Sequence, residues 1–175
     1  MDKSTLATRV KAVAFLEGDF TLRSGKKSKY YMDKYLFETQ PDILEAMGEE
    51  IANRLPAGTR RIAGPELGAV ALAAAASLRS RVPFFIVRNA KKEYGTSKTI
   101  EGKIEKGDTV VLVEDIVTTG GQVLEAIKNI ADAGGTVTKV IVALDRQEGG
   151  RENIEKALPP GATYEAILTK ADLGI

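Results

Sequence analysis

The sequence predicts an α/β fold in which a parallel sheet is flanked by helices. Short apolar runs rich in β-branched residues, such as residues 110–113, alternate with longer segments whose apolar residues recur at helical spacing. Strands that are separated by helices pair in parallel through right-handed crossovers, so this alternation favours a parallel sheet. The chain has 175 residues and no evident linker or internal repeat, and we therefore expect a single domain over residues 1–175.

The first third of the chain is predicted to hold a helix, a hairpin and a second helix. The first helix is expected from about Thr5 to Glu17, where apolar residues share one face. Gly18 to Asp33 indicates two extended segments around a Ser-Gly-Lys-Lys turn. Pro41 suits the first turn of a helix that runs to about Leu55.

The remainder is predicted to alternate between strands and helices. Strands are expected at residues 61–63, 83–87, 110–113, 137–144 and 164–169. An alanine-rich helix over Ala69–Leu78 is expected to pack closely against the sheet, and another from about Val123 to Ala133 follows the third of these strands.

The composition limits the chemistry that the chain can perform. There is no cysteine, which excludes disulfides, thiol catalysis and cysteine-based metal sites. There is also no histidine, the commonest general base and metal ligand. Any catalysis must therefore use Lys, Arg, Asp, Glu, hydroxyl groups and the backbone.

Charge and hydrophobicity indicate a soluble, cytoplasmic protein without nucleic-acid or membrane partners. The formal net charge of +1 gives no general attraction to nucleic acid or to an anionic membrane. The first residues, MDKSTLATRV, lack the apolar core of an export signal. The longest apolar stretch, Ala69–Leu78, is half of the roughly 20 residues that span a bilayer.

The most informative segment is Val110 to Gly121, VVLVEDIVTTGG. Glu114 and Asp115 follow the apolar run, where we expect the strand to leave the sheet and where open α/β folds bind ligands. Residues 118–121 precede a helix, and their small side chains let backbone N–H groups surround an anion. Carboxylates for a diol beside a cradle for a phosphate describe a ribose 5-phosphate site. The competing interpretation is a solvated acidic pair beside a turn that only caps the helix.

This order of residues closely resembles the phosphoribosyl pyrophosphate motif of the type I phosphoribosyltransferases. It lacks the Gly-Lys-Ser/Thr of a Walker A loop and the glycine spacing of a dinucleotide fingerprint. The resemblance implies that the acidic pair holds the ribose hydroxyls, with Asp115 as a catalytic residue that stabilises charge on the sugar. It implies phosphoribosyl pyrophosphate contacts at Glu114, Asp115, Ile116, Val117, Thr118, Thr119, Gly120, Gly121 and Gln122.

A second motif follows the strand predicted at residues 137–144. The string LDRQE at residues 144–148 resembles the orotate phosphoribosyltransferases in particular. In that family an arginine here grips the orotate base, and Arg146 occupies the matching position. Its planar fork of donors suits a carboxylate. The alternative is a surface arginine paired with Asp145 or Glu148.

The predicted hairpin carries a third resemblance to the same family. Phe20-Thr21-Leu22-Arg23-Ser24-Gly25, followed by Tyr30-Tyr31-Met32-Asp33, matches the family's opening hairpin, with Arg23 replacing the usual lysine. The family fold is a parallel sheet flanked by helices, with a small N-terminal hood that we expect over residues 1–40. The implied orotate contacts are Arg23, Tyr31, Met32, Thr118 and Arg146.

Two loops are expected at the same edge of the sheet as the motif. In the family, the loop corresponding to residues 64–68 receives pyrophosphate through backbone N–H groups. Many members carry a lysine there, whereas this chain reads GPELG, so neutralising charge must come from the backbone or from elsewhere. The alternative is a simple turn between strand and helix.

Residues 88–98 form a long polar loop that resembles the family's catalytic lid. Arg88 and Lys92 match the family's arginine and lid lysine, which implies roles for both on pyrophosphate and a catalytic role for Lys92. Asn89 stands where many members have a second lysine, and Tyr94 stands where many have histidine. Lys91 is a second candidate for the lid cation. The alternative is a solvated charged loop.

The resemblance extends from Phe20 to Gly149 and implies an orotate phosphoribosyltransferase of UMP synthesis. Its implied substrates are orotate and phosphoribosyl pyrophosphate, its cofactor is Mg²⁺ held mainly by the substrate rather than by protein ligands, and its assembly is a homodimer. Two alternatives stay open. One is a phosphoribosyltransferase for another base, which Arg146 argues against, and the other is a non-catalytic regulator that senses phosphoribosyl pyrophosphate.

Overall fold

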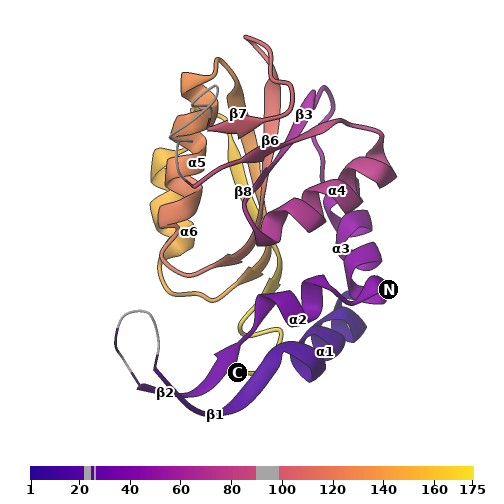
Figure 1. Ribbon diagram of the computed structural model, residues 1–175, viewed down its shortest axis with the longest axis vertical. Coiled ribbons are helices and arrows are strands. Elements are labelled where there is room, and N and C mark those ends of the chain that lie inside the picture. Colours follow the sequence, from indigo (N-terminus) through magenta and orange to yellow (C-terminus); the bar gives the residue numbers. More distant parts are fainter. Residues whose placement is uncertain (22–24, 26, 90–98) are drawn as a thin grey trace.

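The computed structural model of the chain describes residues 1–21, 25, 27–89 and 99–175 (Figure 1). The helices are α1 (Lys3–Ala14), α2 (Lys34–Glu38), α3 (Pro41–Asn53), α4 (Gly68–Ser80), α5 (Gly121–Asp132) and α6 (Gly150–Ala157). The strands are β1 (Phe15–Thr21), β2 (Lys27–Met32), β3 (Arg61–Pro65), β4 (Phe84–Val87), β5 (Ile100–Glu101), β6 (Thr109–Val117), β7 (Thr136–Asp145) and β8 (Thr163–Thr169). None of the described helices is long and apolar enough to cross a membrane.

A six-stranded sheet in the order β5-β4-β3-β6-β7-β8 forms the body of the molecule. All neighbours pair in parallel except β5, which runs antiparallel to β4 at the edge of the sheet. The predicted parallel sheet is therefore present, with one short antiparallel strand that the sequence analysis missed. Two residues are too few for a recognisable strand pattern.

The central strand β6 is buried on both faces. Val111 and Val113 belong to the cluster that packs under α3 and α4, whereas Val110 and Leu112 belong to the cluster under α5. Figure 1 shows α3 and α4 on one side of the sheet and α5 and α6 on the other. The buried strand predicted from this apolar run is confirmed.

Strand β6 continues to Val117, four residues beyond the predicted end. Its pairing with β7 persists to the Val117–Asp145 register pair. Glu114 and Asp115 therefore lie inside the strand and not where it leaves the sheet, which corrects the prediction. An apolar-run criterion stops at a carboxylate, although both of these carboxylates are buried.

The hairpin of β1 and β2 is a separate two-stranded antiparallel sheet, and Figure 1 shows it with α1 and α2 at one end of the large sheet. Helix α1 ends at Ala14, not at the predicted Glu17, because Phe15 already pairs with Met32 across the hairpin. Helix α2 was not predicted. Its side-chain cap is Asp33, which accepts from Tyr35 N at 3.1 Å.

Candidate active site

The loop after β6 forms a cavity at the N-terminus of α5. Thr118, Thr119 and Gly120 connect the two elements, and Gly120 has a φ of 84°, a left-handed conformation that glycine adopts without steric penalty. No side chain caps α5. The N–H groups of its first turn therefore remain available to an anion at the positive end of the helix dipole.

This cavity has a volume of about 360 Å³. Its walls are Glu114, Ile116, Val117, Thr118, Thr119, Gly120, Gly121, Gln122 and Val123. The structure thus places every predicted residue of the phosphoribosyl pyrophosphate motif around one cavity, except for Asp115. The two threonine hydroxyls add donors and acceptors to the backbone groups of the loop.

Helix α6, which the sequence analysis did not predict, packs directly against this loop. A Cβ atom on Gly150 would lie 2.3 Å from Val117 Cγ1 and 2.5 Å from Thr118 O, so the close approach requires glycine. Asn153 Nδ2 donates a hydrogen bond of 3.1 Å to Thr119 O. The first turn of α6 therefore fixes the position of the loop backbone.

The acidic pair is buried beneath the cavity. Glu114 and Asp115 expose only 3% and 2% of their surface. Burial, and then the charge of Asp115, raises the pKa of Glu114 well above its usual value. Glu114 therefore retains a proton more readily than an exposed glutamate. Asp115 differs from Glu114 in having a cation within hydrogen-bond distance.

That cation is Lys34, from the first position of α2. Its Nζ lies 2.8 Å from Asp115 Oδ2, and its side chain is 28% exposed. Burial alone lowers the pKa of Lys34, but the hydrogen bond and charge of Asp115 outweigh burial and leave that pKa raised. The sequence analysis missed Lys34, because nothing in its local pattern distinguishes it from a solvated lysine.

A third carboxyl group, Glu38, lies beside the same pair. It is 3% exposed, and its Oε1 atom is buried without a hydrogen-bond partner. Burial, and then the charge of Asp115, raises the pKa of Glu38 to about 8. A Cβ on Gly68, at the start of α4, would lie 2.0 Å from Asp115 Oδ2 and 2.7 Å from Glu38 Oε1. The end of α4 thus approaches both carboxyl groups through a glycine.

The loop between β3 and α4 is connected to the start of the predicted lid. Asn89 N donates to Glu66 Oε1 at 2.9 Å, and Asn89 Nδ2 donates to Glu66 O at 3.0 Å. Glu66 N in turn donates to Val87 O at 2.8 Å, and the peptide between Glu66 and Leu67 is cis. Asn89, noted in the sequence as a departure from lysine, therefore attaches the base of the lid to this loop.

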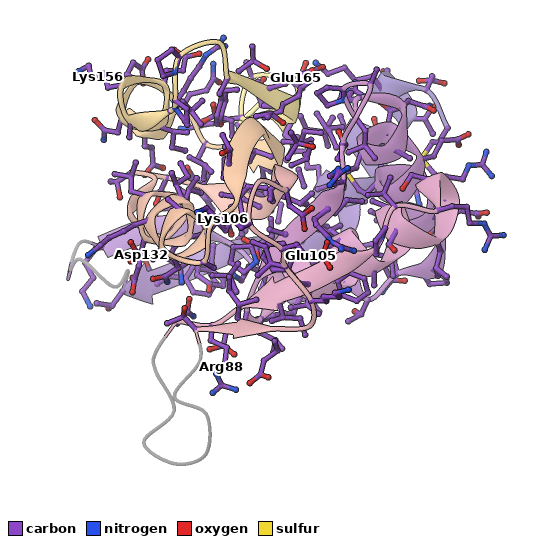
Figure 2. All side chains as sticks on the ribbon, turned by 90° about the horizontal axis from the view of Figure 1, so that it is seen from above. Arg88, Glu105, Lys106, Asp132, Lys156 and Glu165 are labelled. Atoms are coloured by element: carbon purple, nitrogen blue, oxygen red, sulfur yellow. The ribbon has the colours of Figure 1, made fainter. Side chains whose placement is uncertain are left out.

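Arg88 directly follows β4 and lies close to the first turn of α5. It lines a narrow crevice together with Pro65 and Gln122. Its Nη1 atom is 3.7 Å from Glu101 Oε1, and its Nε atom is buried without a hydrogen-bond partner. Figure 2 shows Arg88 at the margin of the molecule opposite Lys156 and Glu165. Arg23, Lys91, Lys92 and Tyr94 lie outside the described residues.

Arg146 follows β7 and lies beside the loop between β6 and α5, which we call the phosphate loop, because the Arg146 N–H donates to Val117 O at 3.0 Å. Its side chain is 17% exposed and makes an ion pair of 2.9 Å with Glu148. Its Nη2 atom also donates to Tyr30 Oη at 3.4 Å. The pairing with Glu148 that the alternative interpretation anticipated is present, but in a half-enclosed position next to the hairpin and not on an open surface.

Two hairpin residues that the sequence predicts to contact orotate, Tyr31 and Met32, differ in their exposure to solvent. Tyr31 is 44% exposed and packs against Phe20, with ring centroids 5.6 Å apart. The side chain of Met32 lies in the hydrophobic core at 4% exposure. Tyr30, which the sequence analysis did not select, is the tyrosine that reaches Arg146.

Comparison with known proteins identifies the family. The Phosphoribosyl transferase domain family matches residues 23–158. The orotate phosphoribosyltransferase of Methanocella arvoryzae is 53% identical over 156 residues, covering 89% of this chain and 87% of that protein. The crystal structure of Mycobacterium tuberculosis orotate phosphoribosyltransferase in complex with Fe(III) dicitrate superimposes with a TM-score of 0.85 at 31% identity, covering 100% of each chain.

A further crystal structure of the Mycobacterium tuberculosis enzyme, in complex with 5-phospho-alpha-D-ribosyl 1-diphosphate, superimposes with a TM-score of 0.80 at 30% identity and covers 100% of each chain. These likenesses confirm the predicted fold class, a type I phosphoribosyltransferase sheet flanked by helices. The chain belongs to the Phosphoribosyl transferase domain family and, within it, to the orotate phosphoribosyltransferases.

Proposed function

We propose that the site at the carboxyl ends of β6 and β7 catalyses transfer of the 5-phosphoribosyl group from phosphoribosyl pyrophosphate to orotate. The products are orotidine 5'-phosphate and pyrophosphate, and the enzyme is a pentosyltransferase of pyrimidine biosynthesis. One observation carries this assignment: Arg146 N donates to Val117 O at 3.0 Å, so the arginine and the phosphate loop start from the same point of the sheet edge.

The phosphate loop and the acidic pair bind phosphoribosyl pyrophosphate in this proposal. Residues 118–122 hold the 5-phosphate through backbone N–H groups and hydroxyls, and Ile116 and Val117 complete the wall. Glu114 and Asp115 accept hydrogen bonds from the ribose hydroxyls. As the bond to pyrophosphate breaks, positive charge grows on the ribose ring, and the charge of Asp115 stabilises it. Binding energy from the remote phosphate positions the reacting carbon.

Orotate binds between Arg146, Thr118 and the hairpin. The arginine fork pairs with the orotate carboxylate, which takes the place that Glu148 holds in the structure. Arg23, Tyr31 and the backbone of Met32 face the flat pyrimidine, since the Met32 side chain is committed to the core. Tyr30 contributes indirectly, by contact with the guanidinium. Orotate reacts as an anion, so the absence of histidine is no obstacle.

Pyrophosphate leaves toward the β3–α4 loop and the lid. Arg88, Lys92 and Tyr94 bind it, and Lys92 neutralises charge that grows during departure, with Lys91 as the alternative lid cation. The backbone N–H groups of residues 64–68 complete this end of the site. Closure of the lid excludes water, which would otherwise capture the sugar cation.

Mg²⁺ fits this site as a partner of the substrate. Among the described residues no group of three or more acidic side chains could hold a metal ion, and Asp115 already pairs with Lys34. Substrate oxygens and water would therefore supply most of its ligands, in keeping with its reluctance to dehydrate. When bound, it neutralises pyrophosphate charge.

We further propose that the chain is one domain that works as a cytoplasmic homodimer. The single body of sheet and helices with hood residues 1–40 at one end supports the domain assignment. The homodimer rests on the family resemblance, in which each lid serves the neighbouring subunit.

The test is a spectrophotometric assay of orotate. Orotate should be consumed only when phosphoribosyl pyrophosphate and Mg²⁺ are both present, and uracil and hypoxanthine should be poor acceptors, because neither offers Arg146 a carboxylate. Chelation of the metal provides the control. Equal rates with uracil would leave only the broader phosphoribosyltransferase assignment, and binding of phosphoribosyl pyrophosphate without turnover of any base would favour the regulator.

A further inference from the structure

Glu38 is a buried carboxyl group to which the reaction above gives no task. It is 3% exposed, its Oε1 atom has no hydrogen-bond partner, and it lies beside Asp115, the residue assigned to the ribose. An unpaired buried carboxyl oxygen destabilises a protein, so we expect this oxygen to gain a partner in another state of the protein. Glu38 in its protonated form interacts with Asp115, and its Oε1 atom remains available to a donor.

Helix α2 places a cation within reach of this acceptor. Lys34 and Glu38 are four residues apart, at opposite ends of α2, so their side chains lie on the same face. That face points toward Asp115, which contacts Lys34 at 2.8 Å and influences Glu38 by its charge. Lys34 also acts electrostatically on Glu38. Among the described contacts, the Lys34 ammonium group is bonded to Asp115 and not to Glu38.

In the proposed reaction, the ribose hydroxyls bind the carboxylate of Asp115, whose Oδ2 atom is bonded to Lys34. Asp115 Oδ1 already accepts a hydrogen bond of 2.5 Å from Ile116 N, and Oδ2 carries Lys34. A ribose hydroxyl that binds Asp115 must therefore share or displace the ammonium group. Lys34 is partly buried, with 28% of its side chain exposed, so a displaced ammonium group is stabilised by a new carboxylate partner.

We propose that Lys34 and Glu38 form an ion-pair switch: Lys34 neutralises Asp115 before substrate binds and moves to Glu38 when the ribose hydroxyls bind Asp115. Both are positioning residues, since they act on substrate through Asp115. This inference rests on the proposed ribose role of Asp115.

The switch couples binding to the release of a proton. Before substrate binds, burial of Glu38 and the charge and hydrogen bond of Asp115, with a smaller contribution from Asp33, raise the pKa of Glu38 to about 8 against the opposing charge of Lys34. Glu38 is therefore mostly protonated at pH 7. Pairing with Lys34 requires the ionised form, so close to one proton should leave Glu38 as phosphoribosyl pyrophosphate binds. Glu114 also has a raised pKa and contributes a background that must be subtracted.

The first test measures protons by calorimetry. Phosphoribosyl pyrophosphate with Mg²⁺ is titrated into the full chain at pH 7 in two buffers of different ionisation enthalpy, and the comparison gives the protons released. Glu38→Gln keeps the shape of the protonated side chain and should remove close to one proton from the wild-type value. It should also weaken binding roughly tenfold, the scale of one charge-assisted hydrogen bond. Glu49→Gln, whose carboxylate pairs with Arg79 on the surface, should change neither value.

The second test is a double-mutant cycle on the same affinity. Lys34→Met removes the moving cation, so Glu38→Gln should have no further effect in that background. Equal effects of Glu38→Gln in both backgrounds would indicate a merely structural residue and overturn the switch, as would unchanged proton release in Glu38→Gln. Wild-type turnover of orotate is checked first, and its absence would refute the proposed reaction instead. If Glu38→Gln folds poorly, Lys34→Met alone provides the test, because this variant should also lose the proton release.

Discussion

At the scale of single residues, the site is organised around one carboxylate. Asp115 is fixed by Ile116 N on one oxygen and by Lys34 on the other, and α4 approaches it through Gly68. A carboxylate held in place before substrate arrives needs no reorganisation when positive charge develops on the sugar. On the side of α4, the same close approach leaves no space for a Cβ atom on Gly68.

Gly68→Ala should therefore disable the enzyme. The new Cβ would lie 2.0 Å from Asp115 Oδ2, so either the carboxylate or the start of α4 must shift. We expect the turnover number to fall about 10²-fold, as when a preorganised electrostatic contact is lost, and the melting temperature to fall through overpacking. Steady-state kinetics and a thermal melt measure the two effects.

The control for this variant is Leu78→Ala, near the other end of α4, where the side chain is 73% exposed. It should affect neither measurement much. An active Gly68→Ala enzyme would show that catalysis does not depend on the observed position of Asp115.

Arg146→Ala tests the base end of the site. The substitution removes a charge-assisted pair to the orotate carboxylate, an interaction worth about 1.5–3 kcal/mol. The orotate KM should rise far more than the KM for phosphoribosyl pyrophosphate, in steady-state assays that vary each substrate. Arg146→Lys should give an intermediate value, because it keeps the charge and loses the fork. The reverse pattern of KM changes would place the base at another strand end.

At the scale of elements, the sequence analysis recovered the parts of the fold that depend on periodic burial. The segments that form β4, β6 and β7 are apolar because helices cover both faces of the sheet. The alternation of these segments with helices along the chain indicated parallel pairing. Helices α2 and α6, with 5 and 8 residues, were missed because a turn or two shows too little periodicity.

The same limit explains which site residues were found. The loop at 118–121 lies in one continuous motif, so sequence alone located it. Lys34, Glu38 and Gly68 act together only because α2 and α4 meet over β6, and no local pattern records that meeting. Tyr30 and Tyr31 are adjacent in sequence, and only the direction of each side chain from β2 decides which one reaches Arg146.

Gly150→Ala tests whether α6 supports the phosphate loop. A Cβ would lie 2.5 Å from Thr118 O and would push the loop backbone away from its position. The KM for phosphoribosyl pyrophosphate should rise roughly tenfold or more, the effect of losing one charged hydrogen bond, with less change in the orotate KM. Arg151→Ala is the matched control, since this neighbour on α6 is exposed and the described contacts of its guanidinium are to Glu155 and to the ring of Tyr164, not to the loop. Equal kinetics for the two variants would make α6 irrelevant to the loop.

At the scale of the whole molecule, the lysines that we assign to pyrophosphate belong to the lid and lie outside the described residues. Arg88 begins the predicted lid and lies at the margin of the molecule (Figure 2), where it lines a crevice together with Gln122. If lids cross between subunits, each complete site needs Asp115 from one chain and Lys92 from the other. This division can be tested by mixing variants.

Lys92→Ala should lower kcat by about 10²–10³ with smaller effects on either KM, because the lost charge acts mainly as pyrophosphate departs. Asp115→Ala should be similarly impaired through the ribose. Mixed chains of the two variants form heterodimers in which one composite site keeps both residues and the other lacks both. Activity well above either parent, measured after mass spectrometry has verified the heterodimers, is the expected result. Verified heterodimers without recovered activity would mean that Lys92 serves its own chain or has no catalytic role.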